Sequence, residues 1–67
     1  MREQILKALI SHAQGDLQKH LANIEVIMNN PVGVADHPNI IDSIEAELHM
    51  AAKYEEQLNL INKYLKK

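Results

Sequence analysis

The 67-residue chain contains no cysteine, no phenylalanine and no tryptophan. Without cysteine it can form neither disulfides nor thiolate metal sites, which commonly stabilise short chains. Without Phe and Trp, and with only two tyrosines, its core must be mainly aliphatic. A chain of this length forms at most one small domain and buries a small share of its surface. Oligomerisation is then the simplest way to bury more apolar surface.

Long apolar runs are also absent. The longest is too short to span a bilayer, and the N-terminus lacks the apolar stretch and cleavage site of a signal peptide. We therefore expect a soluble, cytoplasmic protein without a membrane partner. The formal charge is −2, from seven basic and nine acidic residues. This balance argues against a nucleic-acid partner. The basic residues are spread along the chain, apart from Lys63, Lys66 and Lys67 at its end.

Helix-breaking residues are concentrated in one stretch, residues 29–38, which holds both prolines. Pro31 disfavours the α conformation at the residue before it, so a helix should end near Asn29. Asp36 and Asn39 are candidate N-caps for a second helix. We predict a single domain over residues 1–67, with a helix over about 2–29, a loop over about 30–38 and a helix over about 39–65.

Apolar residues recur at steps of three and four on both sides of this stretch, which predicts two amphipathic helices. We call the stripe of apolar residues along one face of each helix a seam. The first seam consists of Leu6, Ile10, Ala13, Leu17, Ile24 and Ile27, with His20 at the missing step. The second seam consists of Ile40, Ile44, Ala51, Tyr54, Leu58, Ile61 and Leu65, with Glu47 in the gap. Gly15 costs about 1 kcal/mol in a helix. Because the seam keeps its phase through Gly15, we predict a continuous first helix.

The apolar arc on each predicted helix is wider than one antiparallel partner covers. Ile5 and Leu9 on the first helix, and Ile41 and Leu48 on the second, should remain exposed as a contiguous patch, which usually marks an interface. Twofold pairing of two hairpins into a four-helix bundle is the simplest closure, although a trimer or larger ring would also satisfy the pattern. The predicted fold is thus an all-α antiparallel hairpin that forms a homo-oligomeric bundle, with a homodimer favoured.

The two polar interruptions should meet. A hairpin that turns near residues 33–34 pairs His20 with Glu47, and it places His12 opposite Glu55. Asp16 lies one turn from His20 on the same side. One interpretation is a buried hydrogen bond that fixes register and oligomeric state. A second is a metal site, in which His20, Glu47 and Asp16 of two copies supply nitrogen and oxygen ligands. A third is an exposed pair without a structural or functional role.

Motifs for catalysis are missing. Ser11 and Ser43 do not lie in a nucleophile-elbow context, and the sequence has no zinc-protease helix motif, phosphate-binding glycine loop or calcium-binding loop. None of the histidines has a glutamate three residues before it, as carboxylate-bridged di-iron bundles require. We predict a non-enzymatic protein without a cofactor. It would be a structural or interaction protein or, alternatively, a small metal- or ligand-binding module that uses His20 and Glu47.

Four segments carry a family resemblance: Met1–Leu6, Ala13–Gly15, Asn29–Pro38 and Ile40–Leu48. With these residues the chain resembles small proteins encoded by tailed phages of marine cyanobacteria and related marine bacteria. The resemblance covers essentially the whole chain. It implies a viral source, and hence the host cytoplasm or the virion as location. A host or viral protein would then be a further partner. The resemblance brings no assigned activity and no functional residues.

Overall fold

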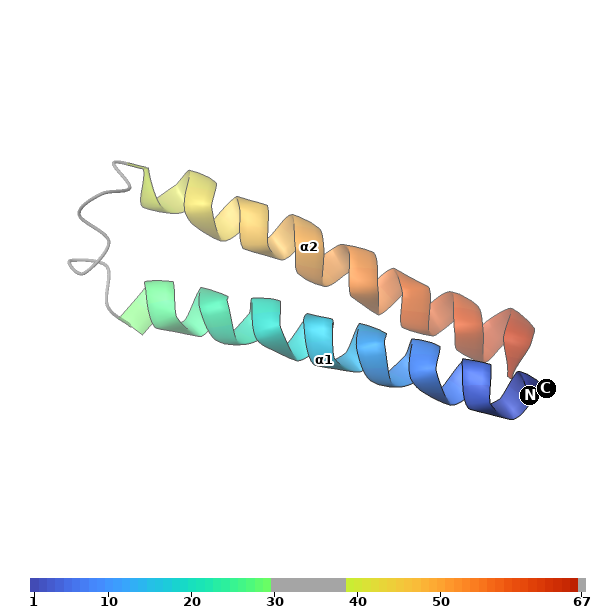
Figure 1. Cartoon of the computed structure of the whole chain (residues 1–67). Coiled ribbons are helices and arrows are strands. Elements are labelled where there is room, and N and C mark those ends of the chain that lie inside the picture. Colours follow the sequence, from blue (N-terminus) through green and yellow to red (C-terminus); the bar gives the residue numbers. More distant parts are fainter. Residues whose placement is uncertain (30–38, 67) are drawn as a thin grey trace.

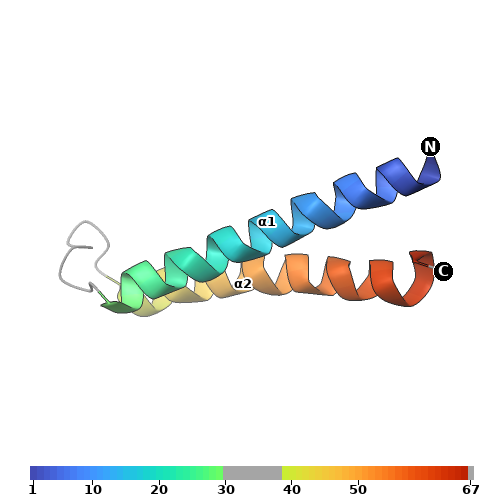
Figure 2. The ribbon, with the colours of Figure 1, turned by 90° about the horizontal axis from the view of Figure 1, so that it is seen from below.

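A computed structural model describes residues 1–29 and 39–66 of the chain. Helix α1 spans Arg2–Asn29, helix α2 spans Ile40–Leu60, and a π-helical turn, η2, continues α2 over Ile61–Leu65. The helices lie antiparallel, side by side, with the chain termini close together (Figure 1). Comparison with the perpendicular view shows that they cross at a shallow angle (Figure 2). The predicted all-α hairpin is confirmed. The predicted loop, with the candidate cap Asp36, lies outside the described residues.

The two seams pack against each other along the hairpin. Every seam residue of α1, including His20, is buried or half-buried. The same holds for the second seam, including Glu47, except at Leu65. Both seams repeat every seven residues, which is slightly less than two turns of a straight α-helix, so the helices must cross to keep the seams in contact. The crossing angle follows from the spacing of the apolar residues.

Helix α1 continues without a break through Gly15. A Cβ atom added at Gly15 would meet no atom within 4 Å outside its own turn, because this position faces away from α2. The prediction of one continuous first helix is confirmed. Nothing in the packing around this position requires a glycine.

Helix α2 has a distinct cap at each end. Asn39 is its N-cap, and the Asn39 Oδ1 accepts a hydrogen bond of 3.0 Å from the backbone N–H of Asp42. At the other end the Lys66 N–H donates to the Ile61 carbonyl at 2.9 Å, which closes the wider π turn. The Arg2 Nη2 donates to the carbonyl of Leu65 at 2.8 Å, so the first helix caps the last turn of the chain.

The prediction that Leu65 belongs to the second seam is wrong, since 43% of its surface is exposed. The hairpin register places it opposite Arg2, which offers a guanidinium instead of an apolar partner. The π turn also changes the angular position of the residues that end the chain. The apolar seam therefore stops one turn before the predicted helix does.

The core is thin. Four apolar side chains of the described residues are buried, and two of them are alanines, Ala13 and Ala51. The hairpin measures 47 × 16 × 15 Å, and its radius of gyration is 15.1 Å. A compact chain of this length would have a radius of gyration of roughly 11 Å. No helix within the described ranges is long and apolar enough to cross a membrane.

Candidate functional site

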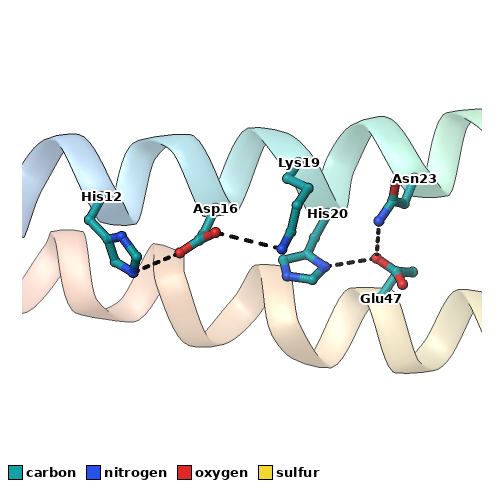
Figure 3. Close-up of polar contacts among 6 residues, drawn as sticks. All are labelled: His12, Asp16, Lys19, His20, Asn23 and Glu47. Carbon is teal, nitrogen blue, oxygen red and sulfur yellow. Dashed lines mark hydrogen bonds and ion pairs between the residues drawn. The ribbon is translucent and has the colours of Figure 1, made fainter.

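His20 and Glu47 form the polar centre of the helix interface. The His20 Nδ1 donates to the Glu47 Oε1 at 2.8 Å, from the α1 seam to the α2 seam (Figure 3). Only 10% of the His20 side chain and 25% of the Glu47 side chain are exposed. The sequence register thus correctly predicted this pair. Each residue satisfies a polar group that would be costly to bury alone.

Glu47 has a second partner. The Asn23 Nδ2 donates to the same Oε1 atom at 2.9 Å, from the next turn of α1 (Figure 3). The hydrogen bond from His20 lowers the pKa of the Glu47 carboxyl below its ordinary value, and the bond from Asn23 acts in the same direction. Partial burial acts the opposite way, because it disfavours the charged form. The helix interface therefore favours an ionised Glu47. Asn23 lies outside the apolar seam of α1, so its role was not predicted from the sequence.

Tyr54 connects this centre to a second histidine. Its ring is stacked nearly parallel to the ring of His20, with centroids 6.0 Å apart. The edge of His12 approaches the same tyrosine at 6.3 Å between centroids. Tyr54 was predicted only as an apolar seam residue. Its ring therefore lies beside both histidines within the helix interface.

His12 and Asp16 form a separate pair on α1. The His12 Nε2 lies 2.9 Å from the Asp16 Oδ2, and the Lys19 Nζ lies 3.8 Å from the Asp16 Oδ1 (Figure 3). The predicted pairing of His12 with Glu55 is wrong. His12 lines a groove with Leu9, Leu60 and Ile61, whereas Glu55 lines another groove with Leu21 and Leu48. The partner of His12 is instead Asp16, one helical turn away in the same helix.

The metal-binding capacity of these residues is limited. Among residues 1–29 and 39–66, no three His, Asp or Glu side chains converge closely enough to hold a metal ion. Asp16 contacts His12 and Lys19, so its carboxylate is already occupied. Since Glu47 accepts from the Nδ1 of His20, it would orient the imidazole, and Nε2 would be the atom that binds a metal. A complete site would need further ligands from another copy.

Eight of the eleven large apolar residues that the helix pairing leaves exposed in the described part form two groups, with Met1, Val26 and Tyr64 outside them. Ile5, Leu9, Ile41 and Leu48 are each about half exposed or more, as expected. They do not form one contiguous patch. The distal patch, far from the chain termini, consists of Leu21, Met28, Ile41 and Leu48. The terminal patch, beside the chain termini, consists of Ile5, Leu9, Leu60 and Leu65.

The two patches lie on opposite flanks of the hairpin. On a helical wheel, Ile5 and Leu9 fall on one side of the α1 seam, whereas Leu21 and Met28 fall on the other. Leu21 shares a groove with Leu48 across the helix interface, and Leu9 shares a different groove with Leu60. Each flank therefore has its apolar cluster over one half of its length, and Val26 is a single exposed apolar side chain in the distal half of the flank that carries Ile5 and Leu9.

Comparison of the chain with protein-family models, with curated proteins and with solved structures finds no match.

Proposed function

We propose that this hairpin is a non-enzymatic structural or interaction protein that acts as a homo-oligomeric helical bundle. The observation that carries the proposal is the exposure of leucine and isoleucine side chains on both flanks of a hairpin with a thin core. Contiguous exposed apolar patches on small proteins usually mark a binding surface. The family resemblance of the sequence adds a viral source, with a host or viral protein as a second partner.

The surface area of the chain supports association. Its accessible surface is 5256 Å². A compact monomer of the same mass, 7.6 kDa, would expose roughly 4,300 Å². The excess of roughly 1,000 Å² exceeds the area of about 800 Å² that each partner buries in a stable interface of standard size. One contact of standard size removes most of this excess, and a contact with a second neighbour removes the rest.

The size of the core also supports association. Ile24 and Ile61 are the two buried apolar side chains larger than alanine in the described part of the chain. Burying such a side chain contributes about 1.5–3 kcal/mol, whereas ordering each residue costs about 1–2 kcal/mol of conformational entropy. Two helices alone would then have little net stability. Burial of the patches between copies would add the missing apolar contacts.

Thermal unfolding at several protein concentrations tests this proposal. Helix content would be followed by far-ultraviolet circular dichroism over a hundredfold range of concentration. Because association stabilises the folded state by mass action, we expect the melting temperature to rise with concentration. A melting temperature that is independent of concentration, together with the scattering mass of one chain, would contradict the proposal.

Metal binding is the second candidate, favoured by the hydrogen bond from His20 to Glu47. Carboxylates commonly hold metal-binding imidazoles in this way. Here each chain would contribute the Nε2 of His20, and association of copies would complete the ligand set. Addition of Zn²⁺ would then raise the melting temperature, and a chelator would reverse the effect. Equal melting curves with zinc and with chelator would exclude this function.

A further inference from the structure

Charge is segregated along the hairpin. Among the described residues, the distal half, residues 15–29 and 39–52, carries one basic side chain, Lys19, against five acidic ones: Asp16, Glu25, Asp42, Glu45 and Glu47. The terminal half, residues 1–14 and 53–66, carries five basic side chains against three acidic ones. Along the sequence, five of the six basic residues of the described part lie in two separate stretches, residues 2–7 and 53–66. Folding into a hairpin brings these stretches to the same half of a rod 47 Å long.

The segregation of charge coincides with the division of the apolar patches. The distal patch lies on one flank of the acidic half, and the terminal patch lies on the opposite flank of the basic half. If two copies paired through the same patch, they would place halves of like charge beside each other. If unlike patches paired, an acidic half would lie beside a basic half. Complementary charge across an interface favours association and fixes its orientation.

We propose that copies of this chain associate head to tail, with the distal patch of one copy packed on the terminal patch of the next. This inference rests on the proposed oligomeric function and specifies its contact. The two rods lie antiparallel, since the distal half of one copy then covers the terminal half of the other. Leu21 and Leu48 of one copy face Leu9 and Leu60 of its neighbour.

Such a contact does not close on itself. When two copies are joined in this way, one of them still presents an uncovered distal patch and the other an uncovered terminal patch. A contact between unlike surfaces forms either a ring or an open stack, depending on the rotation between copies. Because the patches lie on opposite flanks and the rods alternate in direction, the geometry favours an open stack. A twofold dimer would instead use the same patch on both copies.

Two variants distinguish head-to-tail association from a twofold dimer. Each variant lacks one of the two patches. The distal variant carries Leu21→Gln and Leu48→Gln, and the terminal variant carries Ile5→Gln and Leu9→Gln. Glutamine keeps a similar helix propensity and adds no charge. A control with Ala8→Gln and Ala22→Gln changes two exposed α1 residues that belong to neither patch. Masses would be measured by light scattering for each variant alone and for an equimolar mixture.

Head-to-tail association predicts that each variant alone has the mass of one chain, whether it is folded or unfolded. Their mixture should form a one-to-one complex with the mass of two chains, because one intact contact can still form. The control should associate as the unmodified chain does. If either variant alone still forms dimers, or if the mixture stays monomeric, the proposal is wrong. A monomeric unmodified chain would instead contradict the proposed function itself.

Salt provides an independent readout. Raising the ionic strength from about 0.05 M to about 0.5 M shortens the screening length from roughly 14 Å to roughly 4 Å. Contacts between acidic and basic halves should weaken, and the mean mass of the unmodified chain should fall. An increase in mass would indicate that halves of like charge are paired, which would overturn the head-to-tail arrangement.

Discussion

The Nδ1 of His20 lies 2.8 Å from the Oε1 of Glu47, at the point where each apolar seam carries a polar residue. In the register observed, both polar groups are satisfied within one contact. Sliding one helix past the other by a single turn would place each of them against an aliphatic side chain and leave it unpaired. A buried polar pair of this kind can specify register at some cost in stability. We therefore regard the pair as the element that fixes the alignment of α1 with α2.

Replacing both His20 and Glu47 should reduce the free energy of unfolding less than replacing Glu47 alone, which leaves His20 unpaired. Glu47→Leu leaves the Nδ1 of a buried histidine without an acceptor, and we expect a loss of about 1–3 kcal/mol. His20→Leu should cost less, because Glu47 keeps its bond to Asn23 and is partly exposed. The double variant should be neutral or stabilising, since apolar pairs often replace buried polar ones without loss. Urea unfolding of the four proteins measures the coupling. If the losses of the two single variants simply added in the double variant, the two side chains would not be energetically coupled.

Lowering the pH should remove the contribution that Glu47 makes to the stability of the folded chain. Its pKa is lowered in the folded chain by His20 and Asn23, so the folded state favours the ionised carboxylate. The stabilisation is therefore fully present above the pKa of Glu47 in the unfolded chain, near 4.5. It is lost as the pH falls through the lower pKa that Glu47 has in the folded chain. The urea midpoint of Glu47→Gln should depend less on pH below about 4.5 than that of the unmodified chain. Glu45→Gln, an exposed change on the same helix, is the control. An equal flattening in both variants would assign the effect to general charge.

Gly15→Ala should stabilise the hairpin. The added methyl group meets no atom within 4 Å, and the residue lies inside a continuous helix. Alanine should add about 0.5–1 kcal/mol, which would raise the melting temperature by a few degrees. The reverse change at an equivalent exposed position, Ala22→Gly, seven residues further along α1, should lower stability by a similar amount. A loss on Gly15→Ala would show that another copy packs closely on this face.

Arg2 should protect the end of the chain. Its side chain donates to the carbonyl of Leu65, beside the π turn that the Lys66 N–H closes. In Arg2→Ala we expect faster hydrogen exchange in residues 62–66 and a change in global stability below about 1 kcal/mol, because the bond is exposed. Lys7→Ala removes a positive charge five residues further along α1 and serves as the control. Equal exchange in both variants would mean that charge near the N-terminus, and not the hydrogen bond, protects this turn.

The sequence predicted the hairpin because its signals are local and periodic. Two seams with steps of three and four determined the helices, and the constant phase across Gly15 predicted the continuity of α1. The contact between His20 and Glu47 followed from the register alone, since both residues occupy seam positions. Every seam residue points toward the other helix. The position of the turn along the chain is therefore enough to determine which seam residues lie opposite each other.

Residues beside the seams were not predictable in this way. His12 could turn toward Glu55 or toward Asp16, and the centre of the turn alone does not say which flank of the hairpin each residue occupies. The same limitation led to the prediction of one exposed patch, where the structure has two on opposite flanks. The π turn at Ile61–Leu65 has no sequence signal that we can identify. The net charge of each half of the hairpin depends on residues from both helices, which lie far apart in the sequence.

Sedimentation equilibrium of the unmodified chain at micromolar concentrations tests the central claim most directly, because it measures mass without assuming a shape. The exposed leucines and isoleucines on the two flanks predict a mass of at least two chains, or about 15 kDa, rising with concentration. A constant mass of 7.6 kDa with full helix content would contradict the claim.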